Sequence, residues 1–254
     1  MATGTLLLLV GLVTAIALLY ASVGHGGASG YLAVMALLDV APAEMRPAAL
    51  ALNILVAAIG TAKFYRRGYF SWRLFWPFAL LSMPMAYVGG RLVLPDVVYR
   101  PVVGAVLVWA AYRLYRQTGR RARSGTSCDE STRPFILSVA LAAGAGLGLL
   151  SGLTGVGGGI FLSPLLLLAG WADARATSAV AAAFILVNSV AGLLGHLAQY
   201  PALPAFLPWL AVGALAGGWA GAELGSRRFS GTGIRRVLAL ILLGAGVKMI
   251  LAMA

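Results

Sequence analysis

Two glycine clusters contain the residues of this chain that are best placed to bind a ligand. The first cluster runs from Gly24 to Gly30 and the second from Thr154 to Gly159, and each interrupts an apolar run of membrane-spanning length. Helices rarely carry so many glycines, because each costs roughly 1 kcal/mol relative to alanine. In lipid, an interrupted helix persists only where protein or a cavity surrounds its backbone. Paired interruptions in the two halves of a chain are typical of a transporter's binding site.

The two clusters are in register with each other. The aligned pairs are Gly24 with Gly155, Gly26 with Gly157, and Gly27 with Gly158. A short helix is expected to begin after each cluster, and its first N–H groups lack intrahelical acceptors while its dipole adds partial positive charge. Because glycine lets a ligand approach the backbone closely, the clusters predict an anion site at two half-helix N-termini. The open alternative is that these glycines only permit tight helix packing.

Polar side chains inside the clusters could complete such a site. His25 could hold an anion or carry a coupling proton when its imidazole is protonated, since histidine titrates near neutral pH. It could equally be a neutral residue that packs against a helix end. Ser22, Ser29, Ser151 and Thr154 could add hydroxyl donors.

Two pairs of polar residues follow the clusters. Arg46 and Arg175 begin corresponding helices, where they could steer an anion or only extend toward the membrane surface. Asn53 and Asn188 could donate to the substrate or join helices, although their offsets differ. The predicted substrate-binding residues are Gly24, His25, Gly26, Gly27, Ser29, Arg46, Asn53, Thr154, Gly155, Gly157, Gly158, Gly159, Arg175 and Asn188.

The composition indicates an integral membrane protein. The chain has 254 residues, of which 61% are hydrophobic and 10% are charged, whereas soluble domains carry about 25% charged residues. Several apolar segments reach the roughly 20 residues that span a bilayer as a helix. Runs such as Leu165 to Leu168 lack the alternation of barrel strands. We therefore expect an all-α, multi-pass protein of the cytoplasmic membrane, and we interpret the net charge of +12 as a topology signal rather than as a nucleic-acid surface.

Ten apolar segments organise the chain into two similar halves. They lie at about 4–22, 30–38, 46–62, 74–93, 98–115, 134–152, 159–170, 175–195, 204–225 and 234–252. The expected units are a membrane repeat at 1–116, a cytoplasmic linker at 117–133 and a second repeat at 134–254. Each repeat would be a Gly-broken helical hairpin followed by three transmembrane helices. A ladder of small residues that lets helices approach closely is expected at Gly213, Gly217, Gly221 and Gly225.

Charge predicts that the two repeats are inverted. If each glycine cluster is a turning point, 15 of the 19 Lys and Arg residues fall on one side of the membrane. Four plain crossings in each half would instead distribute them 11 to 8. The positive-inside rule favours the first arrangement, with the linker inside and both termini outside.

The second cluster carries a family resemblance. Residues 151–164 contain Gly155, Gly157, Gly158, Gly159 and Pro164 in a G-x-G-G-G-x-x-x-x-P pattern. This pattern resembles the signature of the TauE/SafE family of membrane permeases, also called the toluenesulfonate uptake permease family. Arg175-Ala176-Thr177-Ser178 and Asn188 resemble the helix that follows in that family. The first cluster departs from the pattern, with Ala28 at the third glycine, Ala33 at the proline, and His25 added.

The resemblance implies transport of small sulfur-containing anions such as sulfite or organosulfonates. The expected protein is a secondary transporter without a cofactor, whose partners are a small anion, the bilayer and a coupling proton or cation. The alternatives are a passive anion channel, a membrane enzyme and a cation transporter. An enzyme would need a nucleophile, base or metal set that the sequence does not suggest. A cation transporter would need intramembrane carboxylates, for which Glu223 is the one candidate and is expected at a membrane surface near Arg227.

Overall fold

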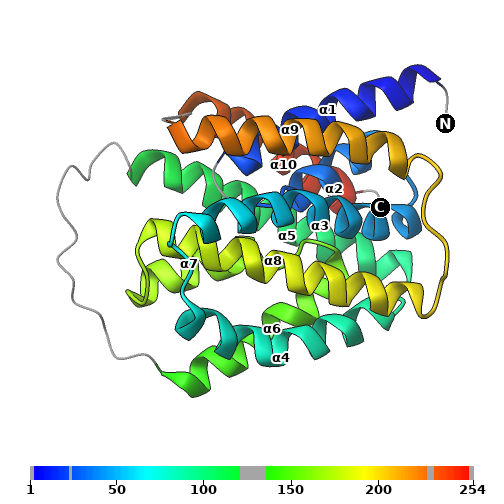
Figure 1. Cartoon of the computed structure of the whole chain (residues 1–254). Helices are drawn as coiled ribbons and strands as arrows, with labels where there is room; N and C mark the ends of the chain where they lie inside the picture. Colours follow the sequence, from blue (N-terminus) through cyan, green and yellow to red (C-terminus); the bar gives the residue numbers. More distant parts are fainter. Residues whose placement is uncertain (1–2, 23–24, 121–135, 228–231, 252–254) are drawn as a thin grey trace.

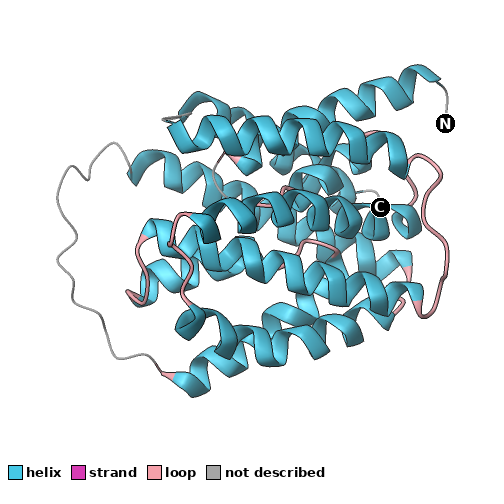
Figure 2. Ribbon diagram, in the orientation of Figure 1, coloured by secondary structure: helices cyan, strands magenta, loops and turns pink. Residues whose placement is uncertain are grey.

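The computed structural model describes residues 3–22, 25–120, 136–227 and 232–251, and these are almost entirely helical. These ranges contain ten helices and no strand, and Figures 1 and 2 show how the helices are arranged. The helices are α1 (Thr3–Ala21), α2 (Ala28–Leu37), α3 (Pro42–Arg66), α4 (Trp72–Arg91), α5 (Asp96–Arg120), α6 (Leu137–Thr154), α7 (Gly159–Ala169), α8 (Ala174–Leu197), α9 (Leu207–Arg227) and α10 (Thr232–Leu251). They coincide with the ten predicted segments, which confirms the all-helical fold. Gly24 and the predicted linker from residue 121 onward lie outside the described residues.

Local sequence signals explain several helix boundaries. Pro42 is the first residue of α3, where its missing N–H would have had no helical acceptor. The Asp173 side chain accepts from the Ala176 N–H at 2.7 Å and so caps the start of α8. Gly27 and Gly158 precede α2 and α7 with positive φ angles of 98° and 75°, a conformation that glycine adopts without steric cost.

The bundle has two ends, which differ in their charges. We call one the linker end, because α5 ends there and α6 begins there; it holds the turns at 67–71 and 170–173. Lys63 and Glu223 form an ion pair there at 3.1 Å, about one turn before the ends of α3 and α9. We call the other the terminal end, because α1 begins and α10 ends there; it holds the turns at 38–41 and 92–95. Lys248 and Asp39 pair there at 2.8 Å.

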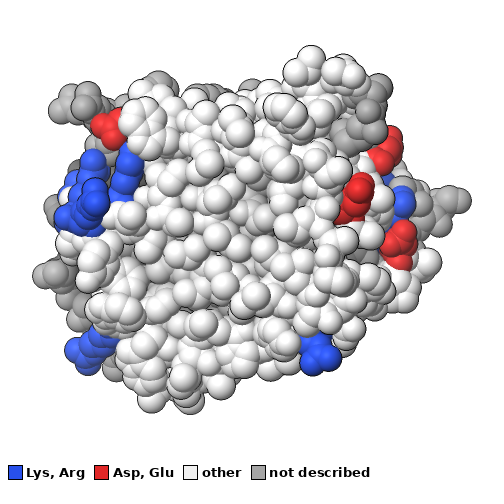
Figure 3. Space-filling view, turned by 45° about the vertical axis from the view of Figure 1, so that its right-hand side comes forward, with Lys and Arg blue, Asp and Glu red and all other residues white. Residues whose placement is uncertain are grey.

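The charged side chains are separated by a broad apolar surface. Figure 3 shows Lys, Arg, Asp and Glu at the two ends of the visible face and uncharged residues between them. In the described part of the chain, four helices are long and apolar enough to cross a membrane: Thr3–Ala21, Pro42–Arg66, Leu137–Thr154 and Arg175–Leu197. Exposed large residues such as Leu7, Trp76 and Val212 would face lipid in such a bundle. The chain is therefore a multi-pass membrane protein.

Small residues bring helices from different halves into backbone contact. Three glycines of the predicted ladder, Gly213, Gly217 and Gly221, pack on α1, with Gly217 against the Thr14 carbonyl and Gly221 against that of Leu18. In α6, Gly148 packs in the same way on the backbone of Ser82 in α4. Its neighbours Gly144 and Gly152, spaced four residues apart, contact Phe78 and Ala86. The α6 series has the same spacing as the α9 ladder, and sequence reasoning did not single it out.

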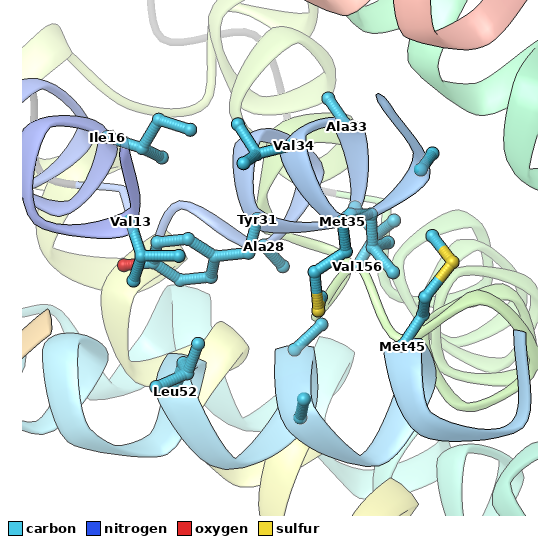
Figure 4. Packing of buried hydrophobic residues seen from close by; sticks show 14 of the residues in the cluster. Val13, Ile16, Ala28, Tyr31, Ala33, Val34, Met35, Met45, Leu52 and Val156 are labelled. Carbon is cyan, nitrogen blue, oxygen red and sulfur yellow. The ribbon is translucent and has the colours of Figure 1, made fainter. Parts of the chain in front are cut away.

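An apolar cluster holds the first hairpin in place. Figure 4 shows Val13 of α1, Tyr31 and Met35 of α2, and Leu52 of α3 packed together. Val156, from the second glycine cluster, lies in the same group of buried residues. The second hairpin therefore inserts its turn into the core that surrounds the first.

The packing glycines yield a stability prediction. Gly148→Ala and Gly217→Ala should each lower the free energy of unfolding by about 1–3 kcal/mol, because the added Cβ would overlap a main-chain carbonyl of the neighbouring helix. Gly146→Ala is the matched control in α6, since nothing lies within 4 Å of its Cβ position. Thermal unfolding of the purified protein measures the difference. Equal melting temperatures for Gly146→Ala and Gly148→Ala would contradict the proposed close contact.

Candidate functional site

The second glycine cluster forms a sharp turn between α6 and α7. Gly155, Gly157 and Gly158 have φ angles of 82°, 79° and 75°, which side chains other than glycine rarely adopt. After this turn the chain runs back along α6, because Gly158 reaches both Leu147 of α6 and Phe184 of α8. The Phe161 N–H donates to the Gly158 carbonyl at 3.1 Å and closes the first turn of α7.

The first cluster makes a comparable turn between α1 and α2. The Tyr31 hydroxyl donates to the Gly26 carbonyl at 3.0 Å, and the Tyr31 N–H donates to the Gly27 carbonyl at 3.0 Å. Gly30 packs on Ile16 and Tyr20 of α1, so α2 returns beside the helix that precedes it. Gly27 and Gly158 both immediately precede a short helix, in agreement with the predicted register of the two clusters.

Asn53 of α3 joins the two turns. Its Oδ1 accepts from the Ala28 N–H, the first in α2, at 3.1 Å. Its Nδ2 donates to the Val156 carbonyl of the second turn and to the Ser189 hydroxyl of α8, each at 3.4 Å. Asn53 is fully buried. One side-chain amide thus satisfies a donor of the first cluster and an acceptor of the second.

The glycines are needed because both turns press against the same two side chains. A Cβ atom on Gly26 would lie 2.6 Å from Asn53 Oδ1 and 3.0 Å from Ile185 Cγ2. A Cβ atom on Gly157 would lie 2.5 Å from Asn53 Nδ2 and 3.0 Å from the same Ile185 atom. Gly26 and Gly157 are an aligned pair, so the structure brings corresponding points of the two halves to one place.

Three of the predicted hydroxyl and imidazole groups lie around these turns. The Ser29 hydroxyl is hydrogen-bonded to the Tyr20 hydroxyl at 2.8 Å. The Thr154 hydroxyl donates to the Leu150 carbonyl at 2.6 Å and accepts from the Val156 N–H at 3.3 Å. His25 Nε2 lies 3.0 Å from the hydroxyl of Ser163 in α7, which links the first turn to the second short helix.

The arrangement places two helix N-termini at the centre of the protein. As in any helix, the first N–H groups of α2 and α7 have no intrahelical acceptor, and the dipoles add partial positive charge. The Ala28 N–H is taken by Asn53. Ser29, Gly159 and Ile160 follow in the first turns of the two helices. Such a pair of termini is chemically suited to an anion with several oxygen acceptors.

Arg46 lies beside the second turn, but its charged head points elsewhere. A Cβ atom on Gly155 would lie 3.2 Å from Arg46 Cγ, so the stem of the side chain touches the turn. The guanidinium donates to the carbonyls of Gly90 and Leu92 at the C-terminus of α4, where a cation is favourable. It also lies 3.3 Å from His196 Nδ1. His196 is buried in the last turn of α8.

The structure does not bring Arg175 or Asn188 into contact with the first turn. Arg175 is exposed at the linker end, where it donates to the Tyr69 hydroxyl at 3.2 Å and lies over the Tyr69 ring. Asn188 is buried and donates from Nδ2 to the Phe184 carbonyl of its own helix at 2.9 Å. The structure instead places Ile185 and Ser189 of α8 beside the turns.

Sequence reasoning missed these α8 residues for different reasons. Ser189 directly follows Asn188, so the prediction of Asn188 missed it by one residue. Ile185 carries no polar signal, yet it lies eleven residues after the start of α8, as Asn53 does after the start of α3. Counting from the helix starts would therefore have paired Asn53 with Ile185 rather than with Asn188. Within the described ranges, no group of three or more His, Cys, Asp or Glu residues could hold a metal ion.

Comparison with known proteins agrees with this architecture. A family model described as "Sulfite exporter TauE/SafE" matches residues 7–249. The chain is also 45% identical over 235 residues to the "Probable membrane transporter protein y4hK" of Sinorhizobium fredii (strain NBRC 101917 / NGR234). That similarity covers 92% of this chain and 94% of the relative. No solved structure matches the chain.

The bridging amide gives a second prediction. Asn53→Ala should lower the free energy of unfolding by about 1–3 kcal/mol, because the buried Ala28 N–H and Val156 carbonyl both lose their partner. Ser189→Ala is the matched control, since it removes one 3.4 Å contact and leaves the bridge between the turns intact. Thermal unfolding of both variants checks the difference. A loss for Ser189→Ala as large as that for Asn53→Ala would show that the bridge is not the stabilising element.

Proposed function

Since the chain belongs to the sulfite exporter TauE/SafE family and is a multi-pass membrane transporter, we propose that its cargo is a small sulfur oxyanion. Sulfite or a small organosulfonate would bind where the two glycine turns meet. The single observation that carries this proposal is the convergence of Gly26 and Gly157 on Asn53 and Ile185. It supports a site that both halves of the chain form together.

The chemistry of the turns suits an oxyanion better than a cation. Main-chain N–H groups at the starts of α2 and α7 are donors, and the two helix dipoles favour negative charge. The acidic residues of the described chain lie elsewhere: Asp39, Glu44, Asp96, Asp173 and Glu223 all lie in or beside turns at the two ends of the bundle. Asn53 adds a neutral amide. Tetrahedral or pyramidal sulfur oxyanions present several acceptor oxygens to such donors.

An inverted-repeat mechanism would let this site face either side of the membrane. Supporting it, α1 begins at the terminal end, whereas α6, the first helix of the second half, begins at the linker end. The first helix of each half packs on the fourth helix of the other half: α1 packs on α9, and α6 packs on α4. Rocking of one half against the other around a fixed central site would then give alternating access.

We further propose that the linker end is cytoplasmic. Lys63, Arg66, Arg67, Arg73 and Arg175 lie at that end. Fewer of the described Lys and Arg residues lie at or near the terminal end, namely Arg46, Arg91, Arg100 and Lys248. This distribution follows the positive-inside rule.

An anion panel tests the proposed site. Sulfite and methanesulfonate should raise the melting temperature of the purified protein, because ligands that bind only the folded state stabilise it. Gly26→Ala and Gly157→Ala should weaken that binding at least about tenfold, equal to 1.4 kcal/mol, since each added Cβ would overlap the Asn53 amide that joins the turns.

Gly217→Ala separates a binding defect from a folding defect. It should lower the melting temperature without weakening the anion-dependent shift, since the added Cβ would meet Thr14 and Ala17 of α1 rather than the turns. Undiminished anion binding by folded Gly26→Ala and Gly157→Ala proteins would place the site elsewhere. Counterflow of labelled sulfite in vesicles distinguishes a transporter from a passive channel, because only a carrier exchanges labelled for unlabelled anion against a gradient.

Cysteine labelling tests the orientation. In a Cys128→Ser background, Gln199→Cys at the terminal end should react with an impermeant thiol reagent added to intact cells, and Ala172→Cys at the linker end should not. Both positions lie in turns or at helix ends. Permeabilised cells provide the control, in which Ala172→Cys should become reactive. Labelling of Ala172→Cys in intact cells would overturn the cytoplasmic assignment of the linker end.

A further inference from the structure

Two buried oxygen atoms near the second turn have no hydrogen-bond partner among the described residues. They are Oδ1 of Asn188 in α8 and Oγ of Ser151 in α6, and both side chains are fully buried. The orientation of the Asn188 amide follows from its surroundings, because its Nδ2 donates to the Phe184 carbonyl at 2.9 Å. Oδ1 therefore faces away from that carbonyl as an unused acceptor. A buried acceptor without a partner is costly unless a ligand or water supplies one.

The two oxygens lie on helices that contact each other. One turn before them, Gly158 joins their helices, since its Cβ position is 2.9 Å from Phe184 Cε1 and 3.4 Å from the Leu147 carbonyl. Phe184 is one turn before Asn188, and Leu147 is one turn before Ser151. Beyond them, the helices touch directly, with the Gly192 Cβ position 3.3 Å from the Gly152 Cα. Asn188 and Ser151 thus lie between two contacts that hold α6 and α8 side by side.

The C-terminal end of α6 favours a positive ligand. Helix α6 ends at Thr154, one turn after Ser151, so the negative end of its dipole and its last carbonyls lie close to Ser151. In inverted-repeat transporters, such half-helix C-termini coordinate Na⁺. A divalent ion is disfavoured because it would need carboxylate ligands to offset its desolvation, and no acidic cluster occurs in the described residues. Neutral oxygens suit a dehydrated monovalent cation.

We propose that Asn188 Oδ1 and Ser151 Oγ belong to a binding site for a monovalent cation of the size of Na⁺, which couples to anion transport. The coupling rests on the proposed function, since it requires an anion at the glycine turns. Ser189, the neighbour of Asn188, lies 3.1 Å from the Cβ position of Gly157 in the second turn. The cation at the end of α6 and the anion at the start of α7 would therefore lie on the two sides of one turn. Their mutual attraction would make each bind more tightly in the presence of the other.

Thermal unfolding of the full-length protein in NaCl, KCl or choline chloride at equal ionic strength tests the cation site without any anion substrate. NaCl should raise the melting temperature in a saturable manner relative to choline chloride. Ser151→Ala and Asn188→Ser should each require about tenfold more NaCl for half of that effect. Ser82→Ala is the matched control: Ser82 is also fully buried in a helix, but its hydroxyl already donates to the Ala79 carbonyl at 3.3 Å. Its response to NaCl should equal that of the unmodified protein.

Two results would overturn the site. Equal melting temperatures in NaCl, KCl and choline chloride would mean that a buried water alone satisfies the two oxygens. An unchanged response to NaCl in folded Ser151→Ala protein would place a cation elsewhere.

Coupling between the two ions is measured separately. NaCl should strengthen sulfite binding about fivefold or more, and sulfite should strengthen Na⁺ binding by the same factor. If Na⁺ stabilises the protein while sulfite never binds, the proposed anion substrate fails and the cation site stands.

Discussion

The structure depends on one constraint: two helices are broken inside an apolar protein, and their free backbone groups must find partners there. Asn53 meets this constraint for both breaks, because its amide accepts from the first N–H of α2 and donates to the Val156 carbonyl of the other turn. Water could satisfy these groups at a surface, but in lipid each unsatisfied group costs several kcal/mol. The two breaks are therefore tied to each other, and the centre of the protein is a junction between its halves.

The remaining helices form a frame that makes this junction possible. Backbone contacts through Gly148 and Gly217 bring α6 onto α4 and α1 onto α9, so the long limb of each hairpin is held by a helix of the opposite half. The short limbs α2 and α7 are 10 and 11 residues long, too short to span a bilayer alone. Their stability must come from the long helices around them, and only a closely packed frame leaves no path for lipid to reach the broken backbone.

Much of the fold could be predicted from the sequence because its signals are local. Apolar length marks all ten helices, and the glycines at 26, 27, 157 and 158 mark the turns, since few other residues tolerate those angles or that close approach. The contacts of the candidate site were harder to predict from the sequence, because they depend on the register of helices that are far apart in the chain. Nothing local indicates that Asn53 meets Ser189 rather than Asn188, or that the Arg46 head binds the end of α4. The closely packed series through Gly148 could have been found, since its four-residue spacing equals that of the series through Gly217.

At this junction the backbones of the two glycine turns are alike, whereas the two side chains that face them differ. The two glycine turns contact the same place with aligned residues, yet the facing positions eleven residues into α3 and α8 are Asn53 and Ile185. If side chains were the main means of recognition, two halves that use one central site would need matching polar residues at these positions. What they share instead is glycine, positive φ angles and a helix start, all of which are properties of the main chain. The preserved backbone and the divergent side chains together favour recognition by main-chain donors, with Asn53 holding those donors in place.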